Sequence, residues 1–353
     1  MKMISRRDFL KASAVVGATA AMTACGGSSS TSTAASSVAA SSAAASSAAA
    51  TNGSANIGVC IYQFADNFMT LYRSDLEEYL KDMGYSVTIM DGKNDQAEQT
   101  NQIDNFINQG VDVLILNLVQ SSSAPSVTDK CNEAGIPVTI ENFAMDGLDD
   151  PGDYIASVAC EYDKIGEAAI KWIAEQDPEA KIFFCAGQEG AGVYEKYQEG
   201  VDRALEELGG DVQVVATLHA DWLTDKAYNV TTDLINSGTE FNYIFANNDM
   251  MAQGCYNALK DAGKENIPIV STGGSPDGFK MLQDGIEAAN MTAPVSIQGV
   301  KTFMNLYNKV ALGEDPAEKF TALPVIPVSA DDTSSYIAWD DYAAAYKYLG
   351  ENK

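Results

Sequence analysis

The chain has 353 residues, which is long enough for two domains of ordinary size. It is strongly acidic, with 49 Asp and Glu residues against 22 Lys and Arg residues and a formal net charge of −27 at pH 7. A negative field of this size repels nucleic acids and anionic membrane surfaces, so we expect neither as a partner.

The first 25 residues have the composition of an export signal, with a basic start, a short apolar stretch and a cysteine at the end. The segment "SRRDFLK", from Ser5 to Lys11, resembles the twin-arginine export signal. The segment "MTAC", which ends at Cys25, resembles the bacterial lipobox, whose cysteine receives lipid after cleavage. We therefore expect residues 1–25 to be a twin-arginine-type lipoprotein signal peptide, with Cys25 as the site of lipidation.

Residues 26–55 consist almost entirely of Ser, Ala, Gly and Thr. A segment with so little to bury is expected to be disordered and to act as a tether. It would hold a globular part, which begins near Asn56, at the outer face of the bacterial cell membrane. No other apolar run approaches 18 residues, so we expect no membrane-spanning helix.

Ten short apolar runs follow, and segments with the spacing of amphipathic helices separate them. Continuous apolar strands that alternate with helices are typical of parallel sheets covered on both faces. Ten strands are many for one twisted sheet, so we expect two doubly wound α/β lobes that divide near Asn142. The predicted strands are residues 57–62, 85–91, 111–117, 136–142, 154–160, 181–187, 212–218, 242–248, 267–274 and 286–293.

Polar and aromatic residues follow the carboxyl ends of these predicted strands, and ligands of open parallel sheets bind outside those ends. Carboxylates and amides match the hydroxyl groups of a polyol, and a flat aromatic ring can cover the C–H face of a sugar. The residues therefore indicate a site for a sugar or a similar small polar ligand, although acidic loops with aromatics also occur as helix caps and core lids. The set comprises Tyr62, Asp66, Phe68, Asp91, Asn117, Asn142, Trp222, Asn247, Asn248 and Asp249.

Four segments resemble the galactose/glucose-binding proteins of sugar ABC transporters, which are type I periplasmic binding proteins. The segments are "IGVCIYQFADNFMTLYR", "NDQAEQTNQIDNFINQGVDVLILNLV", "IPVTIEN" and "ANNDMMAQGCYNALK". The resemblance implies two lobes joined by three hinge crossings, near Asn142, Thr292 and Pro327. It assigns residues 56–141 and 293–326 to the N-terminal lobe, and residues 142–292 and 327–353 to the C-terminal lobe.

The same resemblance implies that the protein captures a galactose- or glucose-like monosaccharide by hinge closure and delivers it to an ABC transporter permease. The protein would act as a monomer without a cofactor. In the family a phenylalanine and a tryptophan sandwich the pyranose ring, while an aspartate and asparagines bind hydroxyl groups. The matching ligand-binding residues are Tyr62, Asp66, Phe68 and Asn117 in the first lobe and Trp222 and Asn248 in the second.

The second lobe departs from the family pattern. Positions that carry polar ligand groups in the family fall on Ala191, Val193, Tyr197 and Gly274, and near Ala293. Polar groups decide the specificity of a site for hydroxyl groups, so the identity of the sugar does not follow from the resemblance. Neighbouring polar residues that could replace the missing groups are Gln188, Glu189, Tyr194, Ser275 and Asp277.

Two other functions are compatible with the sequence. A sensor that presents its closed form to a chemoreceptor or a histidine kinase would use the same closure. An extracytoplasmic enzyme is less favoured, because His219 is the only histidine and no nucleophile motif is present. Bound metal is not expected either, because the family's calcium loop is reduced to Asp177–Ala180. The five cysteines after Cys25 lack C-x-x-C spacing, and we expect them to be buried free thiols.

Overall fold

The computed structural model of the protein describes residues 55–82, 84–143, 152–190, 192–323 and 325–351. All of these residues belong to one compact unit. The expected signal peptide, Cys25 and all of the expected tether except Ala55 lie outside the described residues. Within the described part of the chain, no helix has the length and apolar composition needed to cross a membrane.

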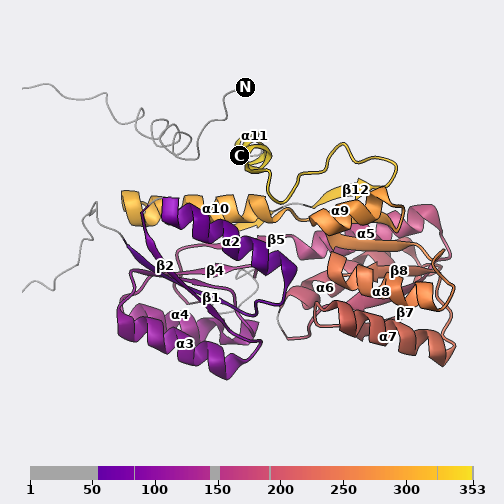
Figure 1. Cartoon of the computed structure of the whole chain (residues 1–353), viewed down its shortest axis with the longest axis horizontal. Coiled ribbons are helices and arrows are strands. Elements are labelled where there is room, and N and C mark those ends of the chain that lie inside the picture. Colours follow the sequence, from indigo (N-terminus) through magenta and orange to yellow (C-terminus); the bar gives the residue numbers. More distant parts are fainter. Residues whose placement is uncertain (1–54, 83, 144–151, 191, 324, 352–353) are drawn as a thin grey trace, which may run out of the picture. The chain divides into compact units, whose positions relative to one another are not determined.

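Two six-stranded sheets form the framework of this unit (Figure 1). Both have the same strand order. The first sheet has the order β11-β5-β4-β3-β1-β2, with parallel pairing throughout. Its strands are β1 (Asn56–Ile61), β2 (Ser86–Asp91), β3 (Val113–Leu116), β4 (Val138–Glu141), β5 (Ser157–Cys160) and β11 (Phe320–Leu323).

Helices cover both faces of the first sheet. They are α2 (Asn67–Asp82), α3 (Gln96–Gln109), α4 (Ala124–Glu133) and α10 (Val295–Tyr307), with a 3₁₀ turn η1 (Ser121–Ser123) before α4 and a π-helical turn η3 (Asn308–Leu312) after α10. α2 and α10 pack together on one face, and α3 and α4 lie on the other (Figure 1). The ends of α3 follow from its sequence, because the Asp95 side chain accepts hydrogen bonds from the first turn and Gly110, at φ 66°, ends the helix in the left-handed conformation.

The second sheet has the order β12-β10-β9-β8-β6-β7 and is parallel except for β12, which is antiparallel to β10. Its strands are β6 (Lys181–Ala186), β7 (Gln213–His219), β8 (Tyr243–Ala246), β9 (Ile269–Gly273), β10 (Glu287–Thr292) and β12 (Ile326–Ser329).

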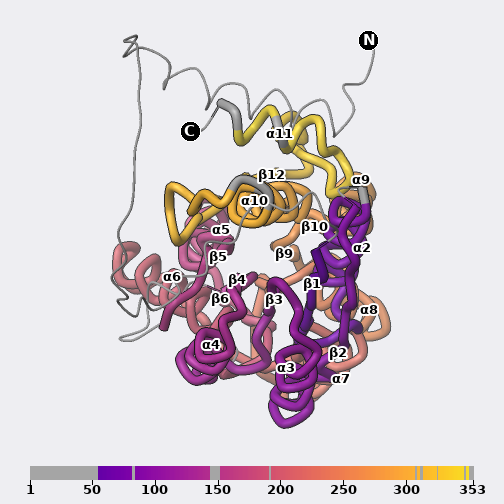
Figure 2. Tube along the Cα trace, turned by 90° about the vertical axis from the view of Figure 1, so that its left-hand side faces the viewer, coloured from indigo at the N-terminus to yellow at the C-terminus, as the bar shows by residue number. Residues whose placement is uncertain are grey.

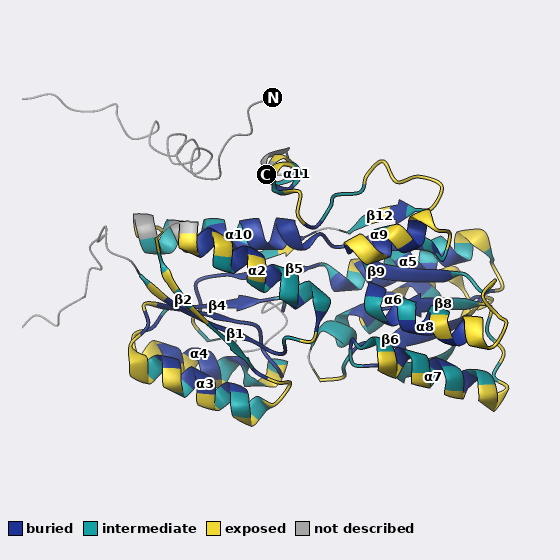
Figure 3. Ribbon diagram, in the orientation of Figure 1, coloured by how far each residue is buried: buried dark blue, intermediate teal, exposed yellow. Residues whose placement is uncertain are grey.

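The helices of the second half are α5 (Tyr162–Gln176), α6 (Val193–Leu208), α7 (Thr224–Ser237), α8 (Asp249–Asp261), α9 (Pro276–Gln283) and α11 (Tyr342–Glu351). α5 and α6 form one pair and α7 and α8 another, on opposite sides of the second sheet (Figure 2). The central strands are buried along most of their length, while the helices alternate buried and exposed residues (Figure 3). The structure thus confirms the predicted fold class of two doubly wound α/β lobes.

Within the described residues the chain crosses between the sheets three times, and the first crossing differs from the expectation. β5 pairs with β4 in the first sheet, so this crossing follows Cys160 and does not lie near Asn142. Sequence alone could not show this, because an apolar strand has the same pattern in either sheet. The second crossing falls after Thr292, and the third falls before β12, which contains Pro327.

The C-terminal part of the chain also differs from the expected division. β11 and β12 were not among the ten predicted strands, because each is a short edge strand with little alternation. β12 joins the second sheet, but α11 packs against α10 of the first lobe. The hydroxyl group of Tyr342 donates to Asp75, and its ring meets the ring of Tyr79 edge-on. Residues 327–351 are therefore shared between the two lobes.

Candidate binding pocket

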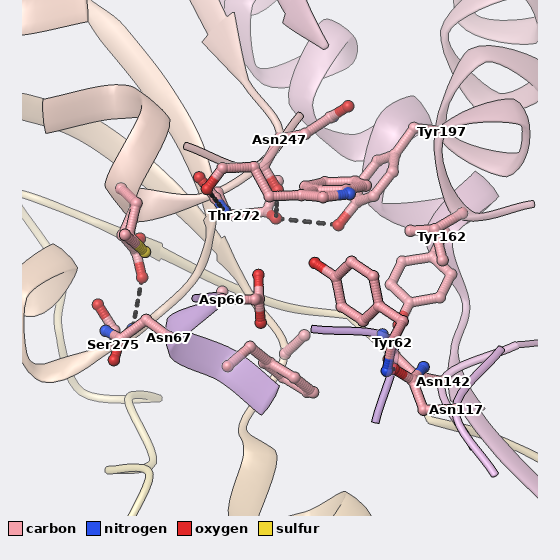
Figure 4. A pocket seen from close by; sticks show the side chains of 18 of the residues that line it. Tyr62, Asp66, Asn67, Asn117, Asn142, Tyr162, Tyr197, Asn247, Thr272 and Ser275 are labelled. Carbon is pink, nitrogen blue, oxygen red and sulfur yellow. Dashed lines mark hydrogen bonds between the residues drawn. The ribbon is translucent and has the colours of Figure 1, made fainter. Parts of the chain in front are cut away.

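A pocket lies where the carboxyl ends of the two sheets face each other, and residues from both lobes line it (Figure 4). It encloses about 830 Å³ of empty space, counted out to the open solvent at its mouth. All six residues that the resemblance assigned to ligand binding line it: Tyr62, Asp66, Phe68, Asn117, Trp222 and Asn248.

Asp66 lies between β1 and α2 and is the N-terminal cap of that helix. Its Oδ1 accepts a hydrogen bond of 2.7 Å from the backbone N–H of Met69, and it also hydrogen-bonds with Tyr62. Only 6% of Asp66 is exposed, and burial raises the pKa of its carboxyl group to about 6. Capping and pocket lining, which the sequence offered as alternatives, therefore occur together in one residue.

Asn117 holds the strand ends of the first lobe in place. Its Oδ1 accepts a hydrogen bond of 3.2 Å from the backbone N–H of Tyr62, and its Nδ2 donates to the Glu141 carbonyl at 3.1 Å. These bonds join the ends of β1, β3 and β4. Asn117 thus lines the pocket while about half of its side-chain hydrogen-bonding capacity is used by the framework.

Asn247 occupies the equivalent place after β8 of the second sheet. Its Oδ1 accepts a hydrogen bond of 3.0 Å from the backbone N–H of Gly187, which follows β6. Its Nδ2 is buried and makes no hydrogen bond within the described residues. In each sheet, therefore, an asparagine side-chain oxygen accepts a hydrogen bond from a backbone N–H at a neighbouring strand end. In the second sheet the Nδ2 group of this asparagine, Asn247, is an unused donor among the residues that the structure describes.

Trp222 and Asn248 form a joint wall of the second lobe. The Asn248 side chain caps α8 by accepting from the Met251 N–H at 2.7 Å, and it donates to the Trp222 carbonyl at 3.2 Å. Asp221 and Trp222 both have left-handed backbone conformations, with φ of 49° and 67°. Such strain is rare for bulky residues and clusters at functional sites.

The proposed replacement residues of the second lobe divide into two groups. Ser275 lines the pocket and caps α9 with its hydroxyl oxygen. Gln188, Glu189, Tyr194 and Asp277 are not among the lining residues. The start of α6 explains the place of Tyr194: Val193 and Tyr197 share the helix face toward the pocket, and Tyr194 turns aside to pack edge-on against His219, with ring centroids 4.6 Å apart.

Val193, Tyr197 and Ala293, on or near which the resemblance places polar ligand groups of the family, line the pocket. The Tyr197 hydroxyl group hydrogen-bonds with Thr272 at 2.9 Å, and burial raises the pKa of Tyr197. Ala191 lies outside the described residues.

Three aromatic lining residues, Phe143, Tyr162 and Trp339, were missed by the sequence analysis. Tyr162 begins α5 directly after β5 and donates to Asn142, so the rule of polar and aromatic residues after strand ends could have found it. Trp339 comes from the segment between β12 and α11, where no strand signal exists. Its Nε1 donates to the Gly273 carbonyl at 2.8 Å, and its ring meets Phe68 edge-on with centroids 5.4 Å apart.

Asp249 lines the pocket, but its carboxylate binds the loop and strands around the pocket. Its carboxylate accepts from the Ser275 N–H at 2.7 Å, from Asn290 Nδ2 at 2.6 Å and from the Ser271 hydroxyl group at 3.3 Å. Burial raises the pKa of its carboxyl group. Its oxygens are thus occupied by the loop after β9 and by the neighbouring strands.

Two α/β lobes with a polar and aromatic pocket between their strand ends define the class of two-lobed binding proteins that close on small ligands. Within it, this chain belongs to the family described as the periplasmic binding protein domain, whose model matches residues 57–315. The expected membership of the type I periplasmic binding proteins is thereby confirmed. A twin-arginine translocation signal matches residues 3–23, so the protein is extracytoplasmic.

Individual relatives agree with this assignment. The chain is 27% identical over 265 residues to the ribose import binding protein of Salmonella typhimurium, covering 75% of this chain and 87% of that protein. It is 28% identical over 310 residues to the D-galactose/methyl-galactoside binding periplasmic protein of Haemophilus influenzae, covering 80% and 91%. A solute-binding protein of an ABC transporter from Bacillus halodurans, solved with bound myo-inositol, aligns with a TM-score of 0.73 and 25% identity over 86% of this chain and 100% of that one. The relatives are binding proteins, and this protein is not an enzyme.

Proposed function

We propose that this protein captures a monosaccharide or a cyclic polyol of similar size outside the cytoplasm and delivers it to the permease of an ABC transporter. The observation that carries the proposal is the pairing of Asp66 with aromatic rings from both lobes around one pocket. A carboxylate accepts hydrogen bonds from hydroxyl groups. Flat rings cover the apolar face of a sugar ring.

The two lobes have different roles in ligand binding. Tyr62, Asp66, Phe68 and Asn117 form the face on which the ligand docks first, and Trp222 and Asn248 come from the lobe that closes over it. The names of the relatives, which bind ribose, a methyl-galactoside and myo-inositol, support a ligand of this size. Closure would present a loaded form to the permease.

The proposal includes attachment to the cell membrane. Cys25 would carry the lipid and residues 26–55 would form the tether, so the binding unit would work close to its permease as a monomer. The match of the export signal up to residue 23 supports processing directly after it.

Calorimetric titration of the purified protein with pentoses, hexoses and cyclitols tests the proposal. At least one neutral or charged polyol should bind, and its binding should change the tryptophan fluorescence, because two of the three tryptophans line the pocket. Asp66→Asn should weaken that binding by about tenfold or more, the effect of losing one hydrogen bond to a charged group. A ligand that binds this variant with unchanged affinity would contradict the assigned site.

A further inference from the structure

The ionisable side chains that line the pocket are all acidic or phenolic. Asp66 and Asp249 contribute carboxyl groups, and no lysine, arginine or histidine belongs to the described lining. The basic residues nearby are engaged elsewhere: Lys226 pairs with Asp221 at 2.5 Å, and Arg73 lies 3.9 Å from the centre of the Phe64 ring. His219 hydrogen-bonds with the Gly187 carbonyl at 2.7 Å.

Asp66 has only neutral hydrogen-bond donors as partners. They are the backbone N–H groups of Phe68 and Met69 and the Tyr62 hydroxyl group, and Asp249 is likewise bonded to neutral donors, as described above. The start of a helix stabilises a negative charge only in part. Burial nevertheless raises the pKa of Asp66, so the hydrogen bonds present do not offset the cost of burying its charge.

The groups that face Asp66 add no positive charge. Tyr62 and Tyr162 both sense the negative charge of Asp66, and Asp221 lies close enough to Tyr62 to raise the pKa of that phenol further. In Figure 4 the Asp66 carboxylate stands in the middle of the pocket, between Tyr62 on one side and Ser275 on the other. A ligand that fills the pocket therefore contacts this carboxylate.

The rest of the lining also attracts cations. Seven aromatic residues surround the space, so aromatic faces are available on most sides of a ligand: Tyr62, Phe68, Phe143, Tyr162, Tyr197, Trp222 and Trp339. The negative face of an aromatic ring attracts ammonium groups. The net charge of −27 raises the local concentration of cationic solutes over neutral or anionic ones.

We propose that the ligand of this pocket carries a protonated amine beside its hydroxyl groups, with Asp66 as the counter-ion of the amine. This rests on the proposed function, because it names the class of polyol that the same site takes: an amino sugar, an aminocyclitol or another hydroxylated amine. The asparagines and Ser275 serve its hydroxyl groups, and the aromatic rings cover its carbon skeleton and the charged nitrogen.

Matched ligands test the proposal by calorimetry at pH 7.5. Each set contains the neutral polyol, its amine and its N-acetyl derivative. The sets are glucose, glucosamine and N-acetylglucosamine, the corresponding galactose compounds, and myo-inositol with an amino-inositol and its N-acetyl derivative. We expect the best amine to bind at least about tenfold more tightly than both its neutral partners, as one close charge pair gives. The acetyl derivative matters because it keeps the nitrogen and removes the charge.

Two variants separate Asp66 from the general negative field. Asp66→Asn keeps a residue that caps helices well, and it should abolish the preference for the amine. Asp221→Asn removes a neighbouring carboxylate that does not line the pocket, and it should retain the preference.

The outcomes distinguish this proposal from the proposed function. If a neutral polyol binds as tightly as its amine, or if Asp66→Asn keeps the preference, the amine proposal is overturned and the polyol function stands. If no member of any set binds, neither stands.

Discussion

Asp66 caps α2 and also lines the pocket, and the charge of its carboxyl group bears on both roles. Burial raises the pKa of this carboxyl group to about 6, above the ordinary value of about 3.9. The folded protein thus holds the proton more tightly than the unfolded chain does. The resulting stabilisation is complete below about pH 4 and is lost as the pH rises through 6.

The variant Asp66→Asn should lack this pH dependence while keeping the helix cap. In urea unfolding without ligand, the variant should gain stability relative to the wild type between pH 4.5 and pH 8, by on the order of 2 kcal/mol. Other buried acids titrate equally in both proteins, so the difference reports Asp66 alone. A difference that stays constant across this range would refute the assignment.

Glu141 is a second buried acid, and it lies outside the pocket. It is 1% exposed and accepts a hydrogen bond of 2.6 Å from Thr302 of α10. Burial raises the pKa of its carboxyl group to about 8, so the same sign applies at higher pH: stability is lost as the pH rises through 8. Glu141→Gln should therefore flatten the decline in melting temperature between pH 5 and pH 8. The half-exposed control Glu98→Gln should follow the wild type there.

At the scale of single elements, the loop after β6 depends on the absence of a side chain. A Cβ atom at Gly187 would lie 2.0 Å from Cη2 of Trp222, which is far inside van der Waals contact. Gly187→Ala should therefore displace the Trp222 ring and weaken ligand binding by about tenfold or more, the worth of a well-packed aromatic contact.

Gly299→Ala provides the matched control for Gly187→Ala, because its nearest neighbour would be at an ordinary 3.8 Å. Calorimetry should show wild-type affinity for this control. Equal affinity in both variants would mean that Trp222 does not contact the ligand.

The segment that leads to α11 supplies Trp339 to the pocket from beyond the region matched by the family model. Its ring is 3% exposed and touches both lobes, through Phe68 and the Gly273 carbonyl. Trp339→Ala should weaken ligand binding by about tenfold or more, while Trp339→Phe should keep most of the affinity, because it retains the edge-on ring contact. Binding should be measured by calorimetry, because both substitutions remove a tryptophan and so change the fluorescence by themselves. Equal loss in both variants would assign the effect to the hydrogen bond instead.

The limits of the sequence analysis also belong to this scale. Tyr62, Asp66 and Asn117 were found because the end of a parallel strand determines where the next few residues lie. Tyr194 was favoured over Val193 because it is polar, but the first residue of α6 decides which side chains face inward, and that boundary is not visible in the sequence. Trp339 was missed since its position depends on a loop that crosses both lobes, and no local pattern encodes such a path.

For the whole molecule, the fold class followed from the alternation of apolar strands and helices, whereas the division into lobes did not. The place of β5 depends on pairing with β4 and β11, and β11 lies some 160 residues further along the chain. Long-range pairing of this kind leaves no trace in the local pattern. The ten predicted strands were all found as β1 to β10.

The lipid anchor can be tested on the whole protein. Cys25→Ser should remove the lipid, so the exported protein should appear in the soluble extracytoplasmic fraction, with the same ligand affinity as the wild type. Fractionation of cells followed by calorimetry checks both results. Persistence of the variant in the membrane fraction would contradict lipidation at Cys25.

The late strands β11 and β12 have a consequence for biosynthesis. They are nearly contiguous, since β11 ends at Leu323 and β12 begins at Ile326, yet each completes a different sheet. During synthesis one edge of β5 and one edge of β10 therefore remain unpaired until residues 320–329 have left the ribosome. Unpaired edges invite association with other chains. Both lobes consequently reach completion almost simultaneously, at the end of translation and not one after the other.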